Sequence, residues 1–417
     1  RRGVMAHKIG KDVVSTGKPS FEVADILRGY IGQYRDAFSL IPVHYKIVHN
    51  ILSCRTAELG GHIEKCNHCG TERISYNSCR NRHCPKCQSM PREKWLDARK
   101  AELLPVHYYH NVFTLPHDLN PIILSNKRIM LNILFKAVSQ TLLDFGQNQK
   151  NRLGGKLGFI AVLHTWDQQL NAHFHLHCLI PGGVLKTDDS WQSTKNAYLF
   201  NVKALSKAFR GKFLDYMTKA YQNGALKFKG TSALFESPEQ FEQLTKSLYS
   251  KKWVVYIQKP IKNPEYVLEY LGRYTHRVAI SNHRIVSVKD GKVTFKYKNR
   301  KTNQPMFCTI TAIEFIRRFL LHALPIGFMR IRHFGFLSNR YKTENIRKIK
   351  VFLGQSAVPD KGVKQSIEEM MRKLTGIDIT LCPCCKKGKM RVVAELPKNT
   401  QSALAEIIWP SILQKAA

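Results

Sequence analysis

The sequence predicts an α+β protein, and three observations lead to that class. Strand and helix patterns mix irregularly through the middle of the chain. Residues 158–166 and 172–183 are rich in apolar and β-branched side chains and flank the short polar turn DQQLN, which predicts a β-hairpin. A cysteine-rich stretch precedes this middle part, and a stretch dense in Arg and Lys follows it. We therefore expect an α+β core flanked by smaller modules.

The N-terminal part is predicted to be helical. Residues 21–53 indicate two helices that break near Pro42, because proline does not fit inside a helix. A third helix is expected from Pro91 to Leu104, with Ser89 and Pro91 as its start signals.

The core combines strands with long helices. Strands are expected at 107–116 and 253–260, where aromatic and β-branched residues gather. Apolar periodicity predicts helices at 121–145 and 202–222. A further helix is expected at 264–276, because Asn263 can cap it and Pro264 suits its first turn.

The C-terminal part begins with a second hairpin, at 284–298, that turns at Asp290-Gly291. A helix follows at 310–324, and a basic stretch runs from Pro325 to Gly354. At 417 residues the chain suggests two or three domains. We expect a basic tail (1–20), a helical and metal-binding part (21–104), a core (105–283) with a helical insertion at about 200–250, a basic α+β region (284–375) and a cysteine-containing tail (376–417).

Charge indicates the partner. The chain has 66 Lys and Arg against 30 acidic residues, a formal net charge of +36. Positive charges in such excess repel one another unless a polyanion neutralises them. The composition therefore favours nucleic acid as the partner over an anionic membrane, and over a basic surface that is merely soluble. No apolar run reaches the roughly 20 residues of a membrane span, and we expect a cytosolic protein.

Clustered cysteines indicate metal. Two CxxC pairs, Cys66-Cys69 and Cys84-Cys87, predict one structural zinc site, because each pair presents two thiolates to a tetrahedral ion. Four nearby residues form a second site or else are a buried thiol, capping histidines and DNA contacts: Cys54, His62, Cys79 and His83. Such a module would orient Arg73, Arg80 and Arg82. The run from Cys382 to Cys385 offers half of a site, with a partner from elsewhere, or is a turn with exposed thiols.

Three histidines alternate on one predicted strand: His173, His175 and His177. Alternate side chains share a face, but the outer two lie roughly 13 Å apart, so a metal ion would use a neighbouring pair and a ligand from another strand. Symmetrical pairing about DQQLN places His164 nearly opposite His175, although a slip of one residue would reverse this. The alternative is a solvated strand face without metal.

Three tyrosines recur every four residues, at Tyr266, Tyr270 and Tyr274, and share one helical face. Such a stripe is either core packing or a source of nucleophiles, because tyrosine forms covalent intermediates in phosphodiester transfer. We assign Tyr266 to packing.

The motifs together resemble the HUH (His-hydrophobic-His) endonucleases, specifically the two-tyrosine transposases of rolling-circle insertion sequences. His175-Leu-His177 precedes Tyr270-Leu-Gly-Arg-Tyr274, and CRTAELGGHIEKCNHCG resembles the zinc-binding domain that opens those proteins. Further blocks extend the resemblance over about residues 25–390, and Phe174 stands where the family often has proline.

The resemblance implies an HUH-like antiparallel sheet and a tyrosine that joins the 5′ phosphate of single-stranded DNA at element ends, target or hairpins. Tyr270 and Tyr274 would be the nucleophiles, and Mg²⁺ or Mn²⁺ would bind His175 and His177, with His164 or His173 as a further ligand. A rolling-circle replication initiator or relaxase, or a non-enzymatic zinc-dependent DNA-binding regulator, stays an alternative. Residues beside the tyrosines and downstream would contact DNA: Arg273, His276, Arg277, Arg330, Arg332, His333 and Arg340.

Overall fold

The computed structural model of the chain describes residues 19–195, 198–261, 263, 266–267, 270, 272, 275–299, 302–355 and 365–399. The expected basic tail lies almost wholly outside them. The described part mixes helices with antiparallel sheets, so the α+β prediction is confirmed. None of its helices combines the length and the apolar character that crossing a membrane requires.

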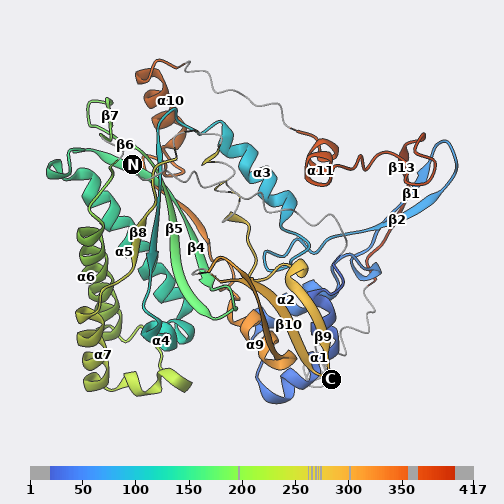
Figure 1. Ribbon diagram of the computed structural model, residues 1–417, viewed down its shortest axis with the longest axis horizontal. Helices are drawn as coiled ribbons and strands as arrows, with labels where there is room; N and C mark the ends of the chain where they lie inside the picture. The colour runs from blue at the N-terminus through green and yellow to red at the C-terminus, as the bar shows by residue number, and fades with distance from the viewer. Residues whose placement is uncertain are drawn as a thin grey trace.

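A seven-stranded antiparallel sheet forms the centre (Figure 1). Its strand order is β7-β6-β4-β5-β3-β8. The strand β12 also pairs with β4, next to the two residues of β4 that pair with β6. The predicted hairpin is β4 and β5, and the predicted strands at 107–116 and 253–260 are β3 and β8. The strands are β3 (Tyr108–Thr114), β4 (Lys156–Trp166), β5 (Ala172–Pro181), β6 (Gly183–Leu185), β7 (Trp191–Ser193), β8 (Val255–Ile257) and β12 (Ile331–Gly335).

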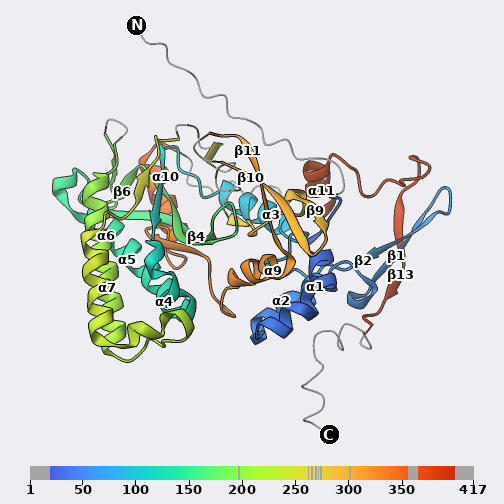
Figure 2. The ribbon, with the colours of Figure 1, turned by 60° about the horizontal axis from the view of Figure 1, so that its bottom comes forward.

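The central sheet has two distinct faces. Successive side chains of a strand alternate between faces, and Phe113, Phe159 and Phe174 enter the main hydrophobic core with the helices α5 (Lys127–Gln147) and α6 (Val202–Gln222). Figure 2 shows α5, α6 and α7 (Pro238–Ser250) gathered at one end of the molecule. The residues in between, including His164, His175 and His177, therefore lie on the opposite face.

The predicted helix at 121–145 is interrupted at Asn126, where α4 (Asn120–Ser125) ends and α5 begins. The amide of Asn126 donates to the carbonyl of Lys227, and its Oδ1 accepts from the Lys227 backbone N–H. This pairing with a distant loop holds Asn126 outside helical geometry, which local apolar periodicity does not reveal.

The N-terminal helices share a core with the C-terminal region. The helices α1 (Val23–Ala37) and α2 (Pro42–Leu52) separate at Pro42 as predicted. They pack with a three-stranded sheet and with α9 (Ala312–Leu321) in one hydrophobic cluster. The predicted turn at Asp290-Gly291 is present, with positive φ at both residues. The strands of this sheet are β9 (Ile285–Lys289), β10 (Lys292–Lys298) and β11 (Pro305–Thr311).

A third, small sheet joins segments from the N-terminal and C-terminal parts of the described chain. Its order is β13-β1-β2, so a C-terminal strand pairs with a hairpin that follows α2. Figures 1 and 2 both show this sheet at the far end of the molecule from α6. Its strands are β1 (Gly61–Cys66), β2 (Glu72–Tyr76) and β13 (Met390–Leu396). Further helices in the described part are α3 (Ser89–Lys100), α10 (Lys342–Phe352) and α11 (Ile367–Thr375).

Candidate active site and metal centres

Three histidines converge on the face of the central sheet that is not covered by α5 and α6. His164 of β4 lies opposite His175 of β5, and His177 follows two residues later on the same face. Each offers one ring nitrogen within 4.8 Å of the others, and His164 and His175 are almost completely buried. Pairing is symmetrical about the turn only at Trp166 and Ala172, and a register shift of one residue between Trp166 and His164 then places His164 directly opposite His175 rather than nearly so. A neighbouring pair on one strand and a third histidine on the next strand can therefore surround one ion.

Hydrogen bonds orient these rings. The Nδ1 atom of His175 lies 3.0 Å from the carbonyl oxygen of His173, which fixes Nδ1 as its donor and gives a ligand role to Nε2. The ring of His173 itself pairs with His117, with 2.9 Å between Nε2 of His117 and Nδ1 of His173. His173 is not a member of the three-histidine group.

A tyrosine and a fourth histidine join the group from neighbouring elements. Nε2 of His110, on β3, lies 2.8 Å from Nδ1 of His177. Nδ1 of His110 lies 2.6 Å from the hydroxyl oxygen of Tyr270, which also lies 2.7 Å from Oε1 of Gln258. The hydroxyl of Tyr270 is therefore two hydrogen bonds from His177. The sequence analysis missed His110, because only the pairing of β3 with β5 brings it beside His177.

One placement of protons satisfies the whole chain of contacts. Nδ1 of His177 donates to Nε2 of His110, Nδ1 of His110 donates to the oxygen of Tyr270, and the Tyr270 hydroxyl donates to Gln258. In this arrangement Nε2 of His177 carries no proton and is the atom that suits a metal ion.

Both linked histidines are neutral at physiological pH. Burial, followed by the positive fields of His164 and His175, holds the pKa of His177 well below its usual range. Burial lowers the pKa of His110 to about 4. A neutral imidazole is the form that binds metal.

The described residues on either side of Tyr270 pack on the same face of the sheet. Val267 is fully buried against Tyr108 and Leu179, and a Cβ at Gly272 would lie 3.0 Å from Leu96 of α3. Tyr266 is 55% exposed, so our assignment of it to packing is wrong. Arg273 and Tyr274 lie outside the described residues.

A pocket opens beside the histidines. Its wall includes Trp166, Arg277 and Arg284, together with His164, His175 and His177. The ring of Trp166 stacks on His164, with 5.1 Å between ring centroids. The sequence analysis did not single out Trp166 or Arg284. An aromatic ring and two guanidinium groups beside a metal-binding surface suit a nucleotide with its phosphate.

His322 holds the turn between β4 and β5 in place. Its Nε2 donates to the carbonyl of Leu170, and its Nδ1 accepts from the hydroxyl of Thr165. Burial lowers the pKa of His322 to about 4, against an ordinary value of 6.5.

The free energy of unfolding is expected to fall as the pH is lowered from about 6.5 to about 4. In this window the unfolded chain protonates His322 and the folded chain does not, so stability is present above pH 6.5 and is lost toward pH 4. The full contribution of this residue is about 3 kcal/mol. Denaturant unfolding at several pH values measures it, and His322→Asn should flatten the profile. An unchanged slope in that variant would rule out His322 as the source.

Two four-cysteine clusters are present, and they are not grouped as the sequence analysis expected. The prediction of one zinc site from Cys66, Cys69, Cys84 and Cys87 is wrong. The strands β1 and β2 lead the first pair away from the second (Figure 1). Cys84 and Cys87 instead meet Cys54 and Cys79, while Cys66 and Cys69 meet Cys382 and Cys385. His62 pairs with Glu64, and His83 is buried outside the sulfur cluster, so neither belongs to a cysteine site.

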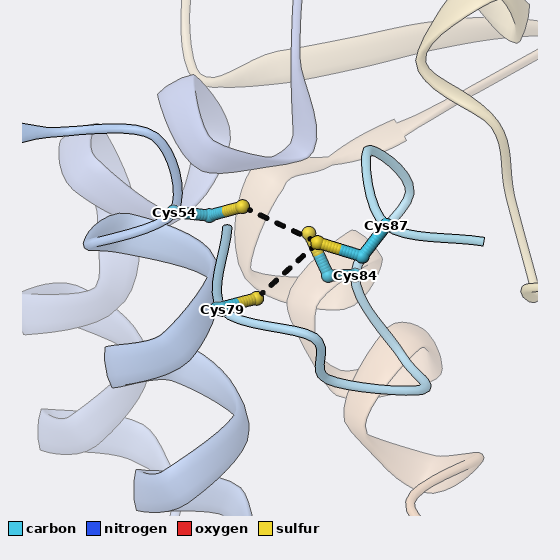
Figure 3. Close-up of side chains that lie close together, drawn as sticks. All are labelled: Cys54, Cys79, Cys84 and Cys87. Carbon is cyan, nitrogen blue, oxygen red and sulfur yellow. Dashed lines mark hydrogen bonds between the residues drawn. The ribbon is translucent and has the colours of Figure 1, made fainter. Parts of the chain in front are cut away.

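The first cluster lies where α2 ends (Figure 3). The sulfur of Cys87 lies 3.4 Å from that of Cys54 and 3.7 Å from that of Cys79, and the four ligand atoms lie within 4.8 Å of one another. Contacts with the other three thiols hold the pKa of Cys87 far below its usual range. Four sulfurs at this spacing suit a tetrahedral zinc ion.

Some of the residues predicted to contact DNA bond to other parts of the protein, and others are exposed. Arg73 pairs with Glu64, Arg82 donates to the carbonyls of Pro325 and Phe328, Arg330 donates to the carbonyl of Arg277, and Arg332 donates to Asn132. His276 and His333 are half-buried, and burial lowers the pKa of each to about 4. Arg80, Arg277 and Arg340 are exposed.

Comparison with known proteins gives the family. The family model described as "Transposase zinc-binding domain" matches residues 26–115, and the one described as "Putative transposase" matches residues 158–345. The "Putative transposase y4qJ" of Sinorhizobium fredii (strain NBRC 101917 / NGR234) is 44% identical over 375 residues, which are 88% of this chain and 94% of that protein. The "Transposase for insertion sequence element IS801" of Pseudomonas savastanoi pv. phaseolicola is 26% identical over 346 residues, 82% of each chain.

The conjugative relaxase TrwC in complex with oriT DNA aligns with 60% of this chain and 73% of its own, at 12% identity and a TM-score of 0.22.

These matches define the class of protein: one that rearranges DNA and carries a zinc-binding module. The chain belongs to the family of two-tyrosine transposases that carry this zinc-binding domain, which confirms the resemblance drawn from its motifs. As a transposase it acts on DNA, and its first cysteine cluster lies within the part of the chain that the zinc-binding domain matches.

Proposed function

We propose that this transposase cuts and rejoins single-stranded DNA through a covalent bond to tyrosine. The observation that carries the proposal is the short path from Tyr270 through His110 to His177. It brings a nucleophilic hydroxyl to the edge of a three-histidine cluster on the sheet face opposite α5 and α6. Tyr274, four residues later in the sequence, is the second candidate nucleophile.

The cluster suits a divalent ion held by His164, His175 and His177. Three neutral ring nitrogens supply part of a coordination shell, and further positions would be left for phosphate oxygens. Nitrogen donors suit a first-row transition ion better than Mg²⁺, so Mn²⁺ is the first ion to test. When bound, the ion would supply Lewis acidity toward the scissile phosphate.

The reaction exchanges one phosphodiester for another. The oxygen of Tyr270 attacks phosphorus, the bond to the 3′ oxygen breaks, and that oxygen leaves as a hydroxyl after it gains a proton. The 5′ end remains on the tyrosine. A 3′ hydroxyl of a second strand then attacks the phosphotyrosine, restores the phenol and joins the strands. No external energy is needed, because each step conserves one ester bond.

Positive side chains near the histidines would hold the DNA. Arg277 and Arg284 line the pocket, and the exposed Arg80 and Arg340 would add contacts to the phosphate backbone. Trp166 could stack an unpaired base beside the scissile phosphate.

Purified protein incubated with Mn²⁺ and single-stranded oligonucleotides tiled across the ends of its own element tests the proposal. A denaturing gel reports a covalent protein–DNA adduct. We expect an adduct on one strand that disappears when Tyr270→Phe and Tyr274→Phe are combined. Tight binding without adduct at any tile, or binding to duplex alone, would instead support a DNA-binding regulator.

His110→Ala is expected to slow adduct formation by about ten- to a hundredfold, a loss typical of residues that orient a metal ligand. His110 acts as a positioning residue, because it contacts both His177 and Tyr270. His110→Asn keeps a donor near the position of Nδ1 and should recover part of the rate. Single-turnover kinetics measure both variants. An unchanged rate in His110→Ala, or no difference between the two variants, would contradict this role.

A further inference from the structure

The second cysteine cluster joins residues more than three hundred positions apart. The sulfur of Cys66 lies 3.8 Å from that of Cys385, and the sulfur of Cys69 lies 3.7 Å from that of Cys382. All four sulfurs lie within 4.8 Å of one another. Cys382 and Cys385 lie outside both segments that the family models match.

The two halves of this cluster have the same backbone geometry. In each half a CxxC turn closes with a hydrogen bond from the residue after the second cysteine to the carbonyl of the first: Gly70 to Cys66 at 3.2 Å, and Lys386 to Cys382 at 3.1 Å. Gly70 and Lys386 both have positive φ, 72° and 57°. Two matched turns that face one another present four sulfurs in the manner of paired zinc knuckles.

Backbone amides point at the sulfurs. The N–H groups of His68 and Cys69 donate to Cys66 at 3.4 and 3.5 Å, and the N–H of Gly388 donates to Cys385 at 3.3 Å. Such N–H···S contacts would orient the sulfurs toward a shared metal ion. The two turns also bond directly, since Asn67 N–H donates to the carbonyl of Lys389 and Lys389 N–H donates to Oδ1 of Asn67.

Apolar packing contributes little to this sheet. The hydrophobic cluster at its base contains only three buried residues, Cys66, Cys382 and Met390. The apolar side chains of Ile74, Val392 and Val393 are all more than half exposed. A sheet this small does not bury enough apolar surface to be stable by itself, and such modules commonly depend on a metal ion or disulfides.

We propose that Cys66, Cys69, Cys382 and Cys385 bind a second Zn²⁺ that fastens the C-terminal strand β13 to the β1–β2 hairpin. The transposase then carries two structural zinc ions. The first would stabilise the segment after α2, and the second would make the C-terminal residues 378–396 a part of the N-terminal zinc-binding module. This inference does not depend on the tyrosine chemistry.

Gly388 allows the two CxxC turns to lie as close together as a shared ion requires. A Cβ at this position would lie 2.4 Å from the sulfur of Cys66, a distance that real side chains do not reach. Gly388→Ala should therefore displace one turn from the other and weaken retention of the second ion.

Metal analysis of the full-length protein, purified with a reducing agent, tests the proposal directly. We expect two zinc ions per chain in the wild type and one in the Cys382→Ser/Cys385→Ser variant. Cys384→Ser is the matched control, since Cys384 lies in the same turn, is exposed and is not a ligand of the cluster; it should retain two ions.

A second measurement keeps the test valid if the double variant folds poorly. Limited proteolysis of the wild type with and without a zinc chelator should show new cleavage near residues 376–390 as the second ion is lost. One zinc ion in the wild type, two in the double variant, or a Cys66–Cys385 disulfide found by mass spectrometry in the metal-loaded protein would overturn the proposal. The adduct assay is independent of all these results, so a failure here leaves the proposed function standing.

Discussion

His177→Ala is expected to reduce metal-dependent strand cleavage by about a hundredfold or more. His177 has the central place in the site: it belongs to the three-histidine group and contacts His110, which contacts Tyr270. Its removal takes away one proposed ligand and the partner that orients His110. Cleavage of an end-labelled oligonucleotide at several Mn²⁺ concentrations measures the effect, and a raised Mn²⁺ requirement would show that binding of the ion is what is lost.

The same strand provides the control. His173 lies four residues before His177, pairs with His117, and is not in the group. His173→Ala should leave cleavage within a few-fold of the wild type. Equal losses in the two variants would mean that the strand tolerates no substitution, whereas full activity of His177→Ala would remove this histidine from the site.

Cys87→Ser is expected to have the largest effect on stability. Cys87 contacts two other sulfurs of the first cluster, and structural zinc commonly contributes on the order of 10 kcal/mol to folding. The segment from Cys79 to Cys87 also carries Arg82, which donates to two carbonyls of the loop from Pro325 to Phe328. Loss of the ion should therefore loosen that loop as well as the N-terminal helices.

Thermal unfolding followed by circular dichroism checks this expectation. We expect Cys87→Ser to lower the melting temperature by about 10 °C or more. Metal analysis should find one bound zinc ion fewer per chain than in the wild type. Cys308→Ser is the control, because Cys308 is a half-buried cysteine of β11 outside both clusters. A Cys87→Ser protein as stable as that control would mean that the first cluster does not hold a structural ion.

The three-histidine group could be predicted because its geometry is local. The short turn makes β4 and β5 antiparallel neighbours and brings His164 within one residue of His175, and a register shift between His164 and Trp166 completes the alignment. The burial of Phe174 and Leu176 follows from the same alternation along β5. The breaks at Pro42 and at Asp290-Gly291 are likewise properties of a few adjacent residues.

The grouping of the cysteines could not be predicted, because it depends on which strands pair. Cys66 and Cys69 are fourteen residues from the next CxxC pair, yet their partners lie more than three hundred residues away. Only the pairing of β13 with β1 selects those partners. The role of Arg82 was missed for the same reason, since the carbonyls that it contacts come from a distant loop.

Mapping the residue that carries DNA tests the central claim most directly. The adduct formed on the active single strand would be digested with a protease and a nuclease, and the peptide bearing the remaining nucleotide identified by mass spectrometry. The account predicts that the nucleotide is attached to Tyr270 or Tyr274 through a 5′ phosphate, and that no such peptide forms without a divalent ion. A nucleotide on any other residue, or an adduct formed equally well in a His175→Ala/His177→Ala protein, would contradict it.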